Sequence, residues 1–195
     1  MINNKGKKKP AKTTKGVQFM KYIRLFSAFF IMISLILQSG CFSRADVSAK
    51  ALLEAIEDCF EEPLPACQRV FDISADHLTR FHLSPSLASL IYYGEKRDEL
   101  FELSLLSECI IRLADGDSGA EIHILRSKAS SHVDTLEKLL YRRLNYIKSR
   151  SLYIYAPENY EKYSFTATVL KRGNYLFLLA TPDNQTAVKV IDKML

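Results

Sequence analysis

The sequence lacks the spacings that hold most catalytic groups and metal ions in proteins. Its four cysteines include no CxxC pair, which argues against a zinc or thiol-redox site. Neither HExxH nor GxSxG occurs, so the common zinc-hydrolase and serine-nucleophile motifs are missing. Only seven glycines are present, and none belongs to a phosphate-binding loop. These absences favour a protein that is not an enzyme, and they leave an enzyme with a dispersed active site as the alternative.

Acidic residues are missing from the first 40 positions, which hold eight of the 27 Lys and Arg residues. The rest of the chain therefore has 19 basic and 22 acidic residues, a net charge of −3, although the whole sequence carries +5. Without a basic stripe that could neutralise phosphates, nucleic acid is not an expected partner.

Residues 1–40 have the three parts of a secretory signal peptide. A basic segment (1–24) precedes an uncharged apolar run (25–37), and small residues follow it. The run is shorter than the roughly 20 residues that span a bilayer. The stretch without charge extends from Leu25 to Ser43, so an uncleaved anchor remains an alternative. We expect translation to start at Met20, which gives a compact leader, and residues 1–19 to be an over-extended reading frame.

Ser39 and Gly40 lead directly into Cys41. This end of the leader resembles a bacterial lipobox, whose cysteine receives a diacylglyceryl group before cleavage. The resemblance implies that Cys41 carries a covalent diacylglycerol and that 41–45 form a short tether. No cofactor is expected. Two acyl chains, such as palmitate, hold a protein stably at a bilayer. The expected partner is thus the membrane, and the expected location is its extracytoplasmic face; an uncleaved anchor or simple secretion would also export the chain.

Cys59 and Cys67 lie on either side of Pro63 and Pro65. Because an exported protein can form disulfides, these two cysteines are a candidate bridge between a helix end and its exit loop. The alternative is that each is a small buried apolar residue. Cys109 lies in a strand pattern, and we expect it in the core.

Residues 46–195 are expected to form a single α+β domain. Period-two alternation predicts strands at 101–113 and 120–126 around the turn sequence 115–119, and a second pair at 164–170 and 175–180. Helical periodicity predicts helices at 46–62, 74–81, 133–150 and 181–195. We therefore predict an antiparallel sheet of two β-hairpins with a long helix between them, on which the N-terminal and C-terminal helices pack.

Capping residues refine two of these helices. Ser74 is expected to cap the short helix, and Thr181 the last one, with Pro182 at its first position. The state of residues 84–93 is ambiguous. His123 should lie on the polar face of its strand, opposite Ile122 and Ile124, and be exposed.

Four tyrosines gather between 151 and 165, a composition that suits binding surfaces. They are Tyr153, Tyr155, Tyr160 and Tyr163. We expect them to face an unidentified envelope protein or surface ligand; the alternative is that they pack on the sheet edge and the long helix.

Three short motifs carry a family resemblance. Glu121 and Ile122 open a strand, Pro157 and Tyr160 follow the long helix, and the sequence GNY (173–175) lies in a hairpin. In these motifs the chain resembles a family of mostly clostridial lipoproteins that carry a domain of unknown function (number four-three-five-eight). The resemblance implies a fold and a location in the cell envelope but no mechanism. A small-molecule or cell-wall ligand is a further alternative, and it would need an aromatic-lined cleft.

Overall fold

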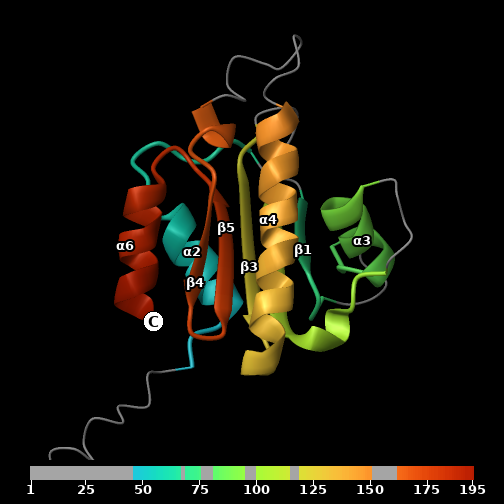
Figure 1. Ribbon diagram of the computed structural model, residues 1–195. Coiled ribbons are helices and arrows are strands. Elements are labelled where there is room, and N and C mark those ends of the chain that lie inside the picture. Colours follow the sequence, from blue (N-terminus) through green and yellow to red (C-terminus); the bar gives the residue numbers. More distant parts are fainter. Residues whose placement is uncertain (1–45, 67–68, 76–80, 95–99, 115–118, 151–161) are drawn as a thin grey trace, which may run out of the picture. The chain divides into compact units, whose positions relative to one another are not determined.

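The central element of the computed structural model is a five-stranded antiparallel sheet with the strand order β1-β2-β3-β5-β4 (Figure 1). The structure describes residues 46–66, 69–75, 81–94, 100–114, 119–150 and 162–195. The strands are β1 (Arg69–Asp72), β2 (Leu106–Leu113), β3 (Glu121–Ser127), β4 (Thr168–Arg172) and β5 (Tyr175–Ala180). The α+β class and the antiparallel sheet predicted from the sequence are confirmed.

Strands β2 and β3 pair with each other, as do β4 and β5, and β3 pairs with β5 to join the two pairs. At the β4–β5 turn Gly173 has a φ of 58°, in the left-handed region that favours glycine. The first predicted strand starts late, because residues 103–105 form the 3-10 helix η1. Strand β4 also begins four residues later than predicted.

Helices cover both faces of this sheet. The first face packs against α3 (Pro85–Tyr93) and α4 (Val133–Arg150), and the second against α2 (Ala49–Glu57) and α6 (Asn184–Met194). Figure 1 shows α4 running along the sheet, with α2 on the opposite side. Strand side chains alternate between the two layers, so all six residues of β5 are buried. The result is three layers, with one apolar core on each side of the sheet.

Side-chain caps determine where α2 and α6 begin. Helix α2 begins after Ser48, whose hydroxyl accepts a hydrogen bond from the Ala51 amide at 3.1 Å. The prediction that Thr181 caps α6 is wrong: Asp183 accepts from the amides of Gln185 and Thr186. A carboxylate is the stronger acceptor at the positive end of a helix, so the start moves by two residues.

Two elements of the structure were not assigned from the sequence, α3 and β1. Residues 85–93 form α3, which starts at the Ser84 cap with Pro85 in its first turn and ends at Gly94, where φ is 68°. Strand β1 was not predicted. The Ser74 amide and hydroxyl both donate to the Asp72 carboxylate. Residues 76–80 of the predicted helix lie outside the described residues, so Ser74 as its N-cap stays a prediction.

Candidate functional site

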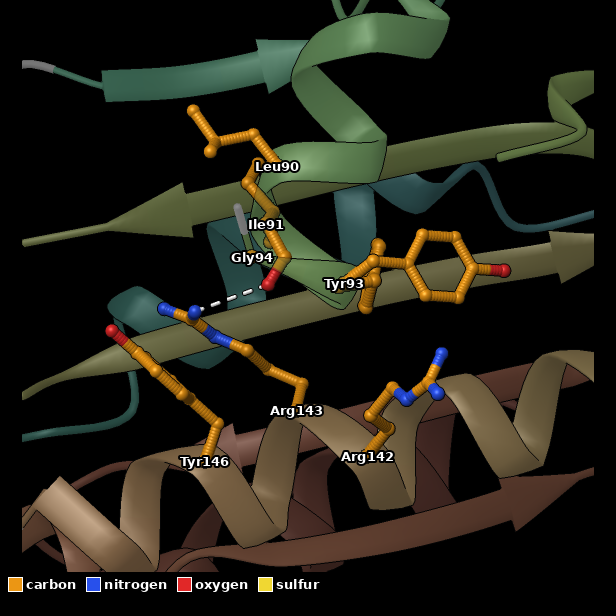
Figure 2. A pocket seen from close by; sticks show the side chains of 8 residues that line it. Leu90, Ile91, Tyr93, Gly94, Arg142, Arg143 and Tyr146 are labelled. Atoms are coloured by element: carbon orange, nitrogen blue, oxygen red, sulfur yellow. Dashed lines mark hydrogen bonds between the residues drawn. The ribbon is translucent and has the colours of Figure 1, made fainter. Parts of the chain in front are cut away.

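A cleft of about 730 Å³ lies between the end of α3 and the middle of α4. Figure 2 shows its lining, which consists of Leu90, Ile91, Tyr92, Tyr93, Gly94, Arg142, Arg143 and Tyr146. Its volume falls within the roughly 300–1,000 Å³ of small-molecule sites. Four of these residues form the end of α3, Gly94 follows it, and three belong to one turn of α4. The cleft therefore depends on how these two helices are held together.

Arg143 joins α4 to both α3 and the sheet. Its guanidinium forms a two-pronged ion pair with Glu121 of β3, with Nη2 at 2.5 Å from Oε1 and Nε at 2.9 Å from Oε2. Its Nη1 donates to the Ile91 carbonyl of α3 at 3.1 Å (Figure 2). The Arg143 and Glu121 side chains are only 12% and 11% exposed. This one side chain therefore fixes three elements around the floor of the cleft.

His123 continues the same network inside the core. Its Nε2 lies 3.0 Å from Oε2 of Glu121, and its Nδ1 lies 2.8 Å from the hydroxyl of Tyr92. Glu121 can only accept, so we assign the ring proton to Nε2, with Nδ1 accepting from Tyr92. The prediction that His123 is exposed is wrong, because α3 and α4 cover the face of β3 that was expected to meet solvent.

Protonation states in this network follow from burial and charge. Burial alone would raise the pKa of Glu121, but the Arg143 charge and the hydrogen bonds from His123 and Arg143 hold it at about 2. Burial lowers the pKa of His123 and outweighs the opposing effect of Glu121. Burial likewise raises the pKa of the Tyr92 hydroxyl well above its usual range. At neutral pH the network thus holds one ion pair together with an uncharged histidine and tyrosine.

Arg142 differs from its neighbour Arg143. Its guanidinium carbon lies 4.8 Å from the centroid of the Tyr93 ring, a cation–π contact between α4 and α3 (Figure 2). Among the residues that the structure describes, none forms an ion pair with Arg142, whereas Arg143 is neutralised by Glu121. Arg143 also lies over the ring of Tyr146 at 5.0 Å. Within the described part of the chain, the cleft therefore offers one cation without a counter-charge beside two aromatic rings.

Most of the residues expected from the sequence to act are not among the residues that the structure describes. Cys41, Cys67, Tyr153, Tyr155 and Tyr160 are all outside the described residues, so the predictions for them stay predictions.

Tyr163 is only 7% exposed and belongs to the same core as α4. For this residue the binding-surface prediction is wrong and the packing alternative holds. Cys109 is fully buried, as predicted. The Cys59 thiol is free in this structure and donates to the Ile56 carbonyl at 3.0 Å. Its pairing with Cys67 stays a prediction.

The cleft residues were missed because only the apolar stripe of α4 was used to interpret that helix. Arg143 lies beside the buried Leu144 and Leu140, at the border of the stripe. An arginine at such a border either extends its charge to solvent or pairs with a buried carboxylate. Glu121, on the same strand face as His123, was the carboxylate available for such a pair.

No family model, curated protein or solved structure matches this chain. The resemblance to the lipoprotein family with a domain of unknown function thus stays a prediction. In the part of the chain that the structure describes, no group of three or more His, Cys, Asp or Glu residues is arranged to hold a metal ion. Nor does any helix there have the length and apolar character needed to cross a membrane.

Proposed function

We propose that this chain is a lipid-anchored extracytoplasmic protein whose domain binds a ligand in the α3–α4 cleft without transforming it. The anchor is argued from the signal-like leader and from Cys41. Binding is argued from one observation, the Arg142 guanidinium that lies over Tyr93 at the wall of a ligand-sized cleft and has no ion-pair partner among the described residues. Aromatic rings with a few convergent polar groups are typical of small-molecule sites.

The walls of the cleft are held in place before any ligand arrives. Arg143 bonds to Ile91 and Glu121, and Tyr92 bonds to His123, so α3 and α4 are both tied to strand β3. Binding to a site that is already ordered loses less conformational entropy, which supports affinity. The buried network thus serves the cleft as a frame.

The same network supports binding over catalysis. His123 is the described residue best suited to act as a base, yet both of its ring nitrogens are hydrogen-bonded and the side chain is fully buried. A general base must reach the proton that it removes, directly or through one water. His123 instead stabilises its neighbours.

The anchor is tested by growing cells with a labelled fatty acid. Wild-type chain should incorporate the label, and Cys41→Ala should lose it and accumulate as a precursor of unchanged mass. Cys59→Ala is the matched control and should keep the label. Persistent labelling of Cys41→Ala would refute lipidation at this residue.

The cleft is tested by screening small aromatic fragments of neutral, anionic and cationic type against the full chain in detergent, by NMR. We expect the perturbed amides to cluster at 90–94 and 142–146. Tyr146→Ala should weaken these shifts, whereas Tyr141→Ala, which removes an exposed tyrosine of the same helix outside the cleft lining, should not. Shifts confined to other parts of the domain would refute the proposal.

A further inference from the structure

The charges around the cleft point to one class of ligand. Among the described residues no Asp or Glu lines the cleft, and of its two arginines Arg143 is already neutralised by Glu121. That leaves Arg142 as the only lining cation whose charge the described residues do not balance. The site accordingly carries one positive charge to offer to a ligand.

The geometry of Arg142 suits a flat anion. The Arg142 guanidinium carbon lies over the Tyr93 ring, and a cation–π contact of this kind uses no N–H group as a hydrogen-bond donor. A guanidinium donates two parallel hydrogen bonds to a carboxylate or phosphate, which a lysine ammonium cannot do. Among the described residues no acceptor for Arg142 is recorded, so its hydrogen-bonding capacity is open to a ligand.

The remaining surface suits an apolar body. Leu90 is 41% exposed and Tyr146 is 48% exposed, and both belong to the cleft lining. Exposed apolar and aromatic side chains beside a single cation are the complement of a molecule with an aromatic or aliphatic part and one anionic end.

We infer that the cleft takes a small carboxylate with an aromatic or apolar body, and that Arg142 is its bidentate partner. This inference rests on the proposed binding function. The one cation that the described residues leave unbalanced matches the single charge of a carboxylate, whereas a phosphate monoester carries about −1.5 to −2 at neutral pH and would need a second cation. The carboxylate belongs either to a small molecule or to the end of a peptide.

The test compares isosteric probes that differ only in charge. Phenylacetate and phenylacetamide are titrated into the full chain in detergent, and so are N-acetylphenylalanine and its amide, which represent a peptide end. We expect each carboxylate to bind at least about tenfold more tightly than its amide, the value of one charge-assisted hydrogen bond. The pair with the larger ratio identifies the source of the carboxylate.

Substitutions test whether Arg142 causes the preference for the carboxylate over the amide. Arg142→Gln should bring the affinity ratio close to one, and Arg142→Lys should retain part of it. Lys189→Gln removes the same charge from α6, on the opposite face of the sheet, and should leave the ratio unchanged. Circular dichroism should be identical for all variants, because the stacking on Tyr93 is the one contact recorded for the Arg142 side chain among the described residues.

Two results overturn the inference and leave the binding function standing. One is equal affinity for phenylacetate and phenylacetamide at the cleft, which would mean that charge is not recognised. The other is tighter binding of phenyl phosphate than of phenylacetate, which would assign a phosphate ligand. If neither these probes nor the aromatic fragments perturb residues 90–94 and 142–146, the binding function itself fails.

Discussion

Removing the Glu121 carboxylate should destabilise the domain strongly. In Glu121→Gln the guanidinium of Arg143, only 12% exposed, keeps its charge but loses its counter-ion. Breaking a buried pair from one side costs about 3–5 kcal/mol, because the remaining charge is left uncompensated. That is a large part of the roughly 5–15 kcal/mol by which most domains are stable.

The acidity of Glu121 gives a second measure of the same interaction. Its pKa is held at about 2 instead of 4.5, and each pH unit is worth about 1.4 kcal/mol, so the ionised carboxylate contributes a net amount on the order of 3 kcal/mol, in which Arg143 and His123 outweigh burial. Because the folded pKa is depressed, this stability is fully present above pH 4.5 and is lost as the pH falls toward 2. The two values agree in size.

Urea unfolding of the full chain in a mild detergent measures the loss. Far-ultraviolet circular dichroism is the suitable signal, because the sequence has no tryptophan. The matched control is Asp192→Asn, which breaks an ion pair with Arg172 whose side chains are 46% and 38% exposed. Exposed pairs contribute less than about 1 kcal/mol, so this variant should remain close to wild type.

The double variant Glu121→Gln/Arg143→Met completes the test. It removes both charges, so it should be more stable than the sum of the two single losses predicts. The reasoning is refuted if Glu121→Gln loses no more than Asp192→Asn, or if the double variant shows simple additivity.

Three further predictions follow from single residues. Burial lowers the pKa of His123 below 6.5, so at acidic pH the unfolded chain binds a proton that the folded chain excludes. The free energy of unfolding should therefore fall as the pH drops below 6.5. Urea titrations at several pH values should show a smaller fall for His123→Gln. Gly173→Ala should lose roughly 1–2 kcal/mol in thermal unfolding through backbone strain alone, since no atom lies within 4 Å of the added Cβ; Gly173→Asn should lose less, and equal losses would argue against strain. Burial also raises the pKa of the Cys109 thiol, so a disulfide reagent should modify Cys109 only in urea; comparison with Cys109→Ala would reveal this.

The sequence predicted the elements whose periodicity is long and regular. Helix α4 spans the predicted residues 133–150, and β5 spans 175–180. Strand β1, only four residues long, has too little pattern to be recognised, and its edge position depends on pairing with β2. Helix α3 was ambiguous because it is apolar on most sides, a consequence of its burial between α4 and the rest of the core.

The candidate site could not be predicted in the same way, since it depends on contacts between distant residues. Glu121 and Arg143 are 22 positions apart, and Tyr92 and His123 are 31 apart. The alternation in β3 was interpreted as one buried and one exposed face, which is correct for a sheet covered on one side only. The second helix layer makes both faces internal, and this turned an apparently exposed histidine into the centre of a buried network.

Enclosure of β3 on both faces also determines how the protein tolerates change. Along β3, Ile122 and Ile124 point into one core and His123 and Leu125 into the other, so consecutive positions are equally constrained. An edge strand such as β4, where all five residues keep some exposure, can accept substitutions far more freely. Sequence drift in this protein should therefore accumulate at the borders of the sheet, while its middle strands change only together with the helices that face them.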